Sequence, residues 1–434
     1  MNSPPNNRRS FLTRAALAGG ALVLPSSALV TSLSTLAGCS SSPKRRTQHY
    51  FLFYFMVGGW DLMLATDPMK QKEGFLIPYD DADIIEHGAH RFGPAMKPLL
   101  PFADKMAVLR GIYCDALNHP QARFRMSTGR FKPSGNVVTE PSIQTLLARE
   151  FGLGYELPNL SSDGMRPATF RGDEPNRLLE PVRVASIEQL KGMVNVRGEI
   201  GSYTDEIAAA VARKDQLTRK AYEGVELASD FGEFADLART LAKSDYRDRV
   251  SGMKASDTND RWKKQSEMAI EAIRLDVAPV ITVGSGEFDT HTRGEYMSHA
   301  AAVTRGFKTV GDIVSGLARI VDDDGRTLLD KTTVVVTSEF SRTPSRNELG
   351  GKHHWPTNAM VLLGKGIRRS KGGPTVFGEV DEGLNHVAVN PKNGSLRSGT
   401  EDIDMAHGLA TVLAAGGLNP GALIGQDAIA DLLA

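Results

Sequence analysis

The chain has 434 residues, and its 51 basic and 51 acidic residues give a formal net charge of zero. A near-neutral chain without a basic stripe gives no electrostatic support to nucleic-acid binding. The length exceeds that of a usual single domain and predicts one large α/β domain with insertions, or two domains.

Residues 1–38 have the features of an export signal. Arg8-Arg9-Ser10-Phe11-Leu12 precedes a weakly apolar stretch, which is typical of a Tat-type signal peptide. The stretch ends in Leu36-Ala37-Gly38-Cys39, which resembles a bacterial lipobox. We therefore expect cleavage before Cys39, lipidation of its thiol, and a lipid-anchored protein of the periplasm or cell envelope. The alternatives are an uncleaved anchor, or an ordinary cleaved signal in which Cys39 is incidental.

The chain that remains after this cleavage would have 48 basic and 51 acidic residues, a formal charge of −3. Its first segment, residues 39–47, is rich in Ser and basic residues and is predicted to be a disordered linker. The other cysteine, Cys114, follows an apolar run and is expected to be buried. If Cys39 is lipidated, no intrachain disulfide is possible.

Several segments carry apolar and charged residues at helical spacing. One is residues 141–151, and the rest fill the region from 186 to 275, which we interpret as a helical insertion into the main domain. Within that region the predicted helices are 187–193, 204–228, 231–242 and 262–275.

Short, continuous apolar runs predict buried strands of a parallel sheet at Tyr50–Val57, Val277–Val283 and Thr332–Thr337. A predicted helix near Met297–Val321 separates the last two, as in a right-handed βαβ unit. The fold class predicted from this order is α/β, with a mostly parallel central sheet in a domain that spans residues 48–434.

Each of these three strands ends close to acidic residues or histidine. Asp61 follows the first strand, Asp289 and His291 follow the second, and Glu339 follows the third. Ligands collect at the carboxyl ends of parallel strands, so one shared metal site is the simplest interpretation. Asp61 and Asp289 could instead be turn or helix-cap residues, and Glu339 could pair with Arg342.

Four motifs in this order resemble the domain-of-unknown-function 1501 family, whose members are exported bacterial proteins of the alkaline phosphatase/sulfatase superfamily. The motifs are Gly58-Gly59-Trp60-Asp61 with Asp67-Pro68, Phe288-Asp289-Thr290-His291, the run from Ser338 to Pro344, and His353-His354-Trp355. The resemblance covers nearly the whole mature chain, and it implies helices on both faces of the sheet.

The resemblance also implies a ligand set. Asp61 and Glu339 match the acidic ligands of one ion, and Asp289 and His291 resemble the Asp/His pair of a second, with His354 or His353 as the partner from the later loop. Mixed carboxylate and imidazole ligands suit Zn, Mn or Fe, whereas oxygen-only sets suit Ca or Mg. We expect one or two divalent ions, with Zn, Mn and Ca as candidates. The loop of His353 and His354 could alternatively be packed aromatic structure.

The segment from Asn118 to Arg130 resembles the sulfatase signature around the catalytic Cys or Ser. When the signature is aligned on Thr128-Gly129-Arg130, its Arg falls on Arg123 and its nucleophile position falls on His119. His119 could act as a nucleophile, a metal ligand or a general base, or it could mark a lost reaction. Arg123 and Arg342 are candidate anion-binding residues, because a guanidinium matches phosphate or sulfate.

Three classes of function stay open at this stage. The first is a metal-dependent hydrolase of a phosphate or sulfate ester, whose substrate is an anionic small molecule or polysaccharide. The second is a catalytically reduced sulfatase-like protein that binds an anionic ligand. The third is an assembly partner in the envelope that keeps only the fold. Metal content separates the third class from the others, and turnover separates the first from the second.

Overall fold

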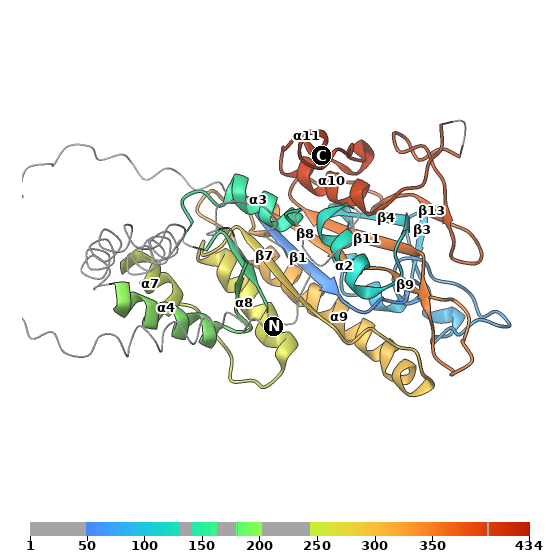
Figure 1. Ribbon diagram of the computed structural model, residues 1–434, viewed down its shortest axis with the longest axis horizontal. Coiled ribbons are helices and arrows are strands. Elements are labelled where there is room, and N and C mark those ends of the chain that lie inside the picture. Colours follow the sequence, from blue (N-terminus) through green and yellow to red (C-terminus); the bar gives the residue numbers. More distant parts are fainter. Residues whose placement is uncertain are drawn as a thin grey trace, which may run out of the picture. The chain divides into compact units, whose positions relative to one another are not determined.

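Apolar runs of the chain form one central sheet (Figure 1). The computed structural model describes residues 49–130, 140–155, 157–162, 179, 181–201, 244–396 and 399–434. Among these residues, eight strands form the sheet: β1 (Tyr50–Met56), β4 (Met106–Tyr113), β5 (Asn159–Ser161), β6 (Val182–Arg183), β7 (Val280–Ser285), β8 (Thr332–Thr337), β11 (Thr357–Gly364) and β12 (Thr375–Phe377).

The strand order is β12-β4-β11-β8-β1-β7-β5-β6, with β1 between β7 and β8. β1 pairs in parallel with both neighbours, and the end of β1 at Met56 is level with Ser285 of β7. β11 is antiparallel to both β8 and β4, while the other pairings within the described sheet are parallel. β4 therefore runs in the same direction as β8, and the two carboxyl ends lie at the same edge.

Three two-stranded ribbons, eight α-helices and several short 3₁₀ helices accompany the sheet in the described residues. The ribbons pair β2 (Ile85–His87) with β3 (His90–Phe92), β9 (Ser341–Arg342) with β10 (His354–Trp355), and β13 (Glu379–Val380) with β14 (His386–Val387). The helices are α2 (His119–Thr128), α3 (Ile143–Phe151), α4 (Ile187–Gly201), α7 (Ser244–Ser251), α8 (Arg261–Arg274), α9 (Arg293–Arg319), α10 (Met405–Ala415) and α11 (Pro420–Ile424).

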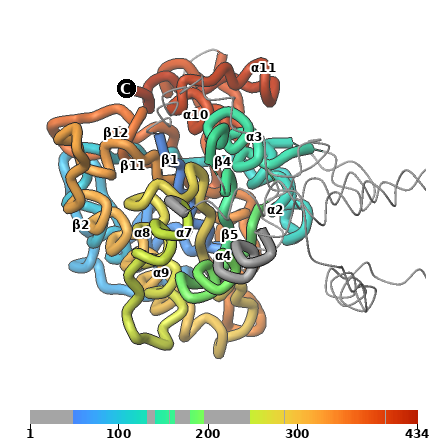
Figure 2. Tube along the Cα trace, turned by 90° about the vertical axis from the view of Figure 1, so that its left-hand side faces the viewer, coloured from blue at the N-terminus to red at the C-terminus, as the bar shows by residue number. Residues whose placement is uncertain are grey.

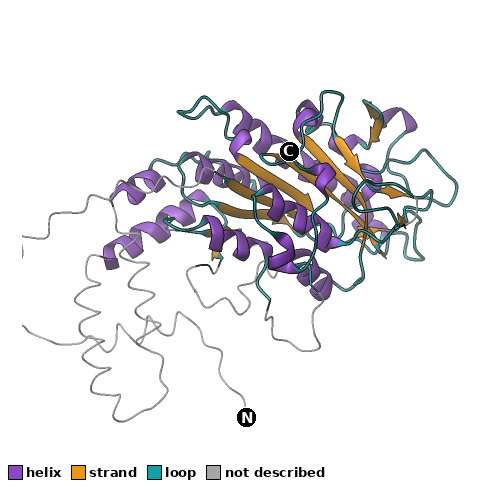
Figure 3. Cartoon of the chain, turned by 90° about the horizontal axis from the view of Figure 1, so that it is seen from above, coloured by secondary structure: helices purple, strands orange, loops and turns teal. Residues whose placement is uncertain are grey.

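Helices cover both faces of the sheet (Figures 2 and 3). The side chains of β1 alternate between the faces, as a pleated strand requires. Leu52 and Tyr54 pack with the apolar residues of α4, α7, α8 and α9, whereas Phe51 and Phe53 pack with those of α2, α3, α10 and α11. The prediction of a mostly parallel α/β sheet with helices on both faces is confirmed.

The predicted helical insertion falls partly outside the described residues. Within its range the structure has α4, α7 and α8, and residues 202–243 are not described, so the predicted helices 204–228 and 231–242 lie outside the described residues. α8 packs against α9 and β7, because its apolar side chains Met268, Ala269 and Ile273 enter the main core. The export signal, Cys39 and the predicted linker also lie outside the described residues.

Candidate functional site

The carboxyl ends of β1, β7 and β8 deliver their following loops to one place. Gly58, which follows β1, donates its backbone N–H to both carboxylate oxygens of Glu339, each at 2.9 Å. Its φ of +124° and the 2.4 Å that would separate an added Cβ from the backbone nitrogen of Asp289 explain why glycine stands there. The loops after the three strands are therefore in direct contact, as the sequence predicts.

His119 reaches the same place from a fourth strand. β4 ends at this edge of the sheet, and α2 begins just beyond it, with the Asn118 side chain capping the helix by accepting the N–H of Gln121 at 3.0 Å. The first helical residue, His119, points its two ring nitrogens at two carboxylates. Nδ1 lies 2.9 Å from Oε1 of Glu339, and Nε2 lies 3.1 Å from Oδ2 of Asp289.

Two more imidazoles meet Asp289. The Oδ1 atom of Asp289 lies 3.0 Å from Nε2 of His291 and 3.6 Å from Nε2 of His354, and these two nitrogens lie 3.1 Å apart. His354 donates its Nδ1–H to the carbonyl of Leu117, so in the neutral ring Nε2 is a bare acceptor. Burial lowers the pKa of His354, which favours this neutral form.

The geometry of these donors fits a divalent cation. His119, Asp289 and His354 each offer one ligand atom, and the three atoms lie within 4.8 Å of one another. Bonds of about 2.0–2.1 Å in a tetrahedral zinc site place neighbouring ligand atoms about 3.3 Å apart. The distance from Nε2 of His119 to Oδ2 of Asp289 is 3.1 Å and that from Nε2 of His354 to Oδ1 is 3.6 Å, and both fall close to that value. Because the set is rich in imidazole, it suits Zn or Mn better than Ca.

Arg342 holds Asp289 in place, and all of its N–H donors are bonded to groups of the protein. A guanidinium has five N–H donors. Here they face the side chain of Asp289 and the backbone carbonyls of Gly58, Gly59, Thr290 and Lys352. Its side chain is 0% exposed. The prediction that Arg342 binds a substrate anion is therefore corrected: every donor is engaged within the protein.

The carboxyl group of Asp289 is ionised because Arg342 lies beside it. Burial alone would raise its pKa, but the hydrogen bond and the charge of Arg342 outweigh burial and hold the pKa at about 2. The side chain remains 44% exposed, and that of His291 is 38% exposed. The cluster therefore opens to solvent on the side of these two residues.

Glu339 supports His119 from behind. Its side chain is 0% exposed and accepts hydrogen bonds from Gly58, from Ser338 Oγ at 3.0 Å, from His119 and from Arg123 Nε at 3.1 Å. Burial would raise the pKa of Glu339, but the His119 hydrogen bond and the Arg123 charge outweigh burial and lower it. A carboxylate that holds the far ring nitrogen of a metal-ligating histidine fixes its tautomer and orientation. We therefore assign Glu339 to support His119 rather than to the ligand set, and the alternative pairing with Arg342 is not seen.

Asp61 is the predicted ligand that the structure does not bring into the cluster. Its Oδ1 accepts the N–H of Met63 at 3.0 Å and thereby caps the short 3₁₀ helix Leu62–Leu64. Its Oδ2 accepts from the ammonium of Lys352, and both side chains are 0% exposed. Asp61 is therefore a helix cap, which was the alternative interpretation of the sequence. Lys352 carries no local sequence signal, because its partner lies 291 positions away.

Nearby hydroxyl and thiol groups are engaged elsewhere. Ser127 and Thr128 donate to the carbonyls of Arg123 and Phe124 within α2, at 2.8 and 2.9 Å. The buried thiol of Cys114 faces the backbone carbonyl of Glu339 at 3.6 Å, and burial raises its pKa. These groups are unsuited to act as nucleophiles.

Arg123 and His353 are the two remaining residues of the predicted site. Arg123 uses Nε on Glu339, and no described residue accepts a hydrogen bond from its two terminal nitrogens; its side chain is 23% exposed. The ring of His353 lies 5.8 Å from that of His291, but its Nε2 is 3.3 Å from a Glu348 oxygen, and the group of possible ligand atoms contains His354 and not His353. The choice between the two adjacent histidines therefore favours His354.

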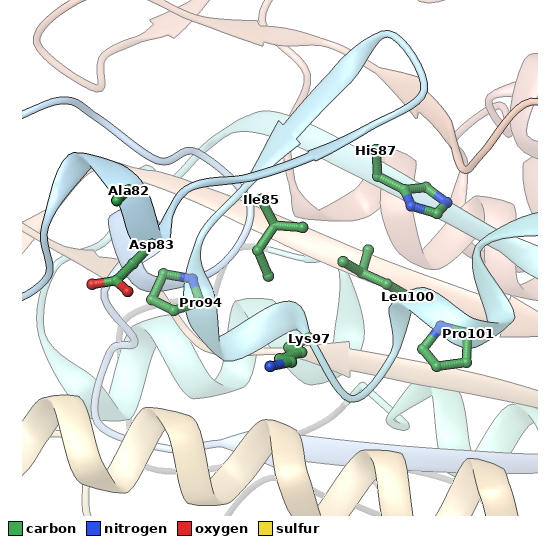
Figure 4. A pocket seen from close by; sticks show the side chains of 8 residues that line it. All are labelled: Ala82, Asp83, Ile85, His87, Pro94, Lys97, Leu100 and Pro101. Atoms are coloured by element: carbon green, nitrogen blue, oxygen red, sulfur yellow. The ribbon is translucent and has the colours of Figure 1, made fainter.

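A separate pocket of about 680 Å³ lies beside the β2–β3 hairpin (Figure 4). Its lining includes Ile85, Pro94 and Leu100 together with His87 and Lys97. None of the predicted site residues lines it, so it plays no part in the cluster.

Comparison with known families covers most of the residues of this site. The model of a family described as "Protein of unknown function (DUF1501)" matches residues 165–395, which include Asp289, His291, Glu339 and His354. The chain belongs to the DUF1501 family. The resemblance seen in the sequence motifs is thus confirmed, while a search of curated proteins found no match for this DUF1501 protein.

Solved structures similar to this DUF1501 protein include sulfatases and members of the alkaline phosphatase superfamily. Ps i-CgsB in complex with k-i-k-neocarrahexaose is 11% identical, with 88% of this chain and 75% of that chain covered and a TM-score of 0.41. The PsFucS1 sulfatase from Pseudoalteromonas sp. is 13% identical over 90% and 73% of the two chains, at a TM-score of 0.36. The Mg-bound TAB5 alkaline phosphatase mutant is 12% identical over 86% and 99%, at a TM-score of 0.37.

Proposed function

We propose that this DUF1501 protein is a divalent-metal-dependent hydrolase of a phosphate or sulfate ester. The observation that carries the proposal is the convergence of Nε2 of His119, His291 and His354 on the two carboxylate oxygens of Asp289, at 3.0 to 3.6 Å. Isolated surface histidines do not gather in this way around one ionised carboxylate, and such donor sets are typical of Zn or Mn sites.

The residues of the chain divide the work between binding and orientation. Glu339 holds Nδ1 of His119 so that Nε2 faces the cluster, and Arg342 holds Asp289 in its ionised form. The exposed side of the cluster lies at Asp289 and His291, where an ester can approach. The terminal nitrogens of Arg123 supply donors for the oxygens of a phosphoryl or sulfuryl group.

A divalent cation held by this set would polarise an ester oxygen and lower the pKa of water. The nearby hydroxyls and the thiol are engaged, so water is the attacking group in the proposed reaction. The oxygen of water bonds to phosphorus or sulfur, the bond to the ester oxygen breaks, and the alcohol leaves with a proton. The substrate class in this proposal is an anionic small-molecule or polysaccharide ester.

The test compares two adjacent histidines. His354→Ala removes a donor of the cluster, whereas His353→Ala changes a neighbour that faces Glu348. We expect the metal content of His354→Ala to fall by about tenfold or more, because the variant lacks one ligand of the ion. Turnover on a panel of phosphate and sulfate esters should be lost with the metal. His353→Ala should keep both. Equal metal content in the two variants, measured by elemental analysis, would contradict the proposal.

A second candidate rests on His119, which stands where the sulfatase signature has its nucleophile. A protein that has lost the reaction would still hold metal and bind an anion without turning it over. Metal-loaded wild-type protein that binds a phosphonate but hydrolyses no ester of the panel would replace the hydrolase proposal by this one.

We also propose export and lipid attachment through Cys39. The support is the twin arginine at Arg8-Arg9 and the sequence Leu36-Ala37-Gly38-Cys39. No helix among the described residues is both long and apolar enough to cross a bilayer. Mass spectrometry of the mature N-terminus tests the proposal, and a start at any residue other than Cys39 contradicts it. Cys39→Ala should move the protein from the membrane fraction to the soluble exported fraction.

A further inference from the structure

Three carboxylates that follow strands of the sheet at this edge each pair with a cation of their own. Asp289 pairs with Arg342 at 2.6 Å, Glu339 pairs with Arg123 at 3.1 Å, and Asp61 pairs with Lys352. The charges of these six groups sum to zero before any ligand binds.

Once Glu339 and Asp61 are set aside, the remaining ligand atoms of the cluster suffice for one metal ion. His119, Asp289 and His354 each offer one ligand atom, all within 4.8 Å of one another, and three protein ligands leave the fourth position of a tetrahedral ion open for water or an ester oxygen. Asp61 is fully buried with one oxygen on the N–H of Met63 and the other on the ammonium of Lys352, so a metal ion would have to displace that ammonium to bind it. A second divalent ion would lack carboxylate ligands among the described residues at this edge.

The charge of the site also limits it to one divalent ion. Neutral imidazoles add nothing to the sum, so one divalent ion gives the site a net charge of about +2 and a second would give about +4. A further acid beside the cluster, Glu295, accepts the backbone N–H groups of His291 and Thr292. Its carboxylate is exposed, so water screens its charge.

Resting on the proposed metal site, we propose that the site takes one divalent cation and that the loaded site prefers a doubly charged phosphate monoester over a singly charged sulfate ester. A phosphate monoester carries a charge of about −1.5 to −2 at neutral pH, which matches the excess of about +2. A sulfate ester carries one negative charge and leaves about one positive charge unmatched, which is costly where the groups are partly desolvated.

The first measurement is the metal content of wild-type protein that has been saturated with Zn or Mn and freed of excess metal. We expect one equivalent per chain. Two equivalents overturn this inference and leave the proposed metal-dependent function standing. No bound metal overturns the proposed metal site and this inference with it.

The second measurement uses a matched pair of inert probes, phenylphosphonate and benzenesulfonate, at a pH where the phosphonate is doubly ionised. Calorimetry on the zinc-loaded protein should show at least about tenfold tighter binding of the phosphonate. Coulomb attraction of one further unit charge at short range near a protein surface exceeds what a factor of ten requires. Equal affinity, or tighter binding of the sulfonate, overturns the charge argument.

Variants at two arginines of the α2 segment give the control. Arg123→Gln removes the fixed cation that pairs with Glu339 and should reduce the phosphonate-to-sulfonate ratio by about threefold or more. Arg130→Gln removes a charge that lies just beyond the C-terminus of the helix, is 42% exposed and pairs with Glu140 at 3.6 Å. It should leave the ratio unchanged. A ratio that stays constant in Arg123→Gln, with metal content intact, contradicts the inference.

Discussion

Replacing Lys352 by Met removes one half of the buried ion pair and leaves the other half in place. The methionine fills similar space, but Asp61 is left with a buried, uncompensated charge. Both side chains are 0% exposed, so water cannot reach Asp61 in the native structure. One of its oxygens keeps the N–H of Met63, which reduces the penalty without removing it.

Breaking a buried ion pair from one side costs about 3–5 kcal/mol. Since one oxygen keeps a backbone donor, we expect Lys352→Met to lower the free energy of unfolding by about 3–4 kcal/mol. Asp61→Asn should cost a similar amount, because it strands the ammonium of Lys352. The double variant removes both charges and should lie within about 2 kcal/mol of the wild type. The two single costs should therefore be strongly non-additive.

Urea unfolding of the four proteins measures these differences, and an unchanged slope against urea shows that the surface exposed on unfolding is the same. Metal content serves as a second measurement, and we expect Lys352→Met to keep its bound ion because Lys352 is not a ligand. The reasoning is refuted if Lys352→Met costs less than about 1 kcal/mol, or if the two single costs simply add.

Three further changes test other parts of the structure. Gly58→Ala should cost about 2 kcal/mol or more in thermal unfolding and weaken metal binding, because the new Cβ would meet the backbone of Asp289 at 2.4 Å. Arg342→Lys keeps the charge but cannot supply five donors, so metal affinity and unfolding temperature should both fall. Burial would raise the pKa of Asp330, but hydrogen bonds, including that from Lys105, lower it from 3.8 to about 2. Asp330→Asn should thus be less stable than wild type above about pH 4, and acid titration should show the gap closing as the pH falls through about 2.

The strands that carry the site could be predicted from the sequence because they are buried on both faces. Thr332–Thr337 is found at the predicted bounds, and the run Tyr50–Val57 forms a strand that ends at Met56. Such runs are apolar without alternation, which distinguishes them from half-exposed strands. The helix predicted near Met297 begins earlier, at Arg293, since Thr292 and Glu295 form a capping box there.

The strand ends predicted that Asp289 and His291 lie at the site, and the family resemblance added His354 from the later loop; the structure places the three side chains together. The roles of Arg342 and Lys352 could not be predicted from the sequence. Arg342 is committed by four backbone carbonyls, and no residue pattern records where a carbonyl will point. The pairing of Lys352 with Asp61 depends on tertiary packing between distant segments, so local spacing carries no sign of it.

The reversed strand β11 has a consequence for how this site can vary. Because β8 arrives at the site edge and β11 departs from it, residues 338–356 form one loop whose two ends are both anchored there. The ribbon of β9 and β10 joins the two sides of that loop, with Arg342 opposite His354. Its tip, residues 345–349, is mostly exposed beyond this ribbon. Insertions or exchanges at the exposed tip positions should therefore leave Glu339 and His354 in place, provided that Asn347 is kept, because its side chain donates to the carbonyl of His291 at 2.8 Å. One scaffold can thus diversify what it recognises without rebuilding its ligand geometry.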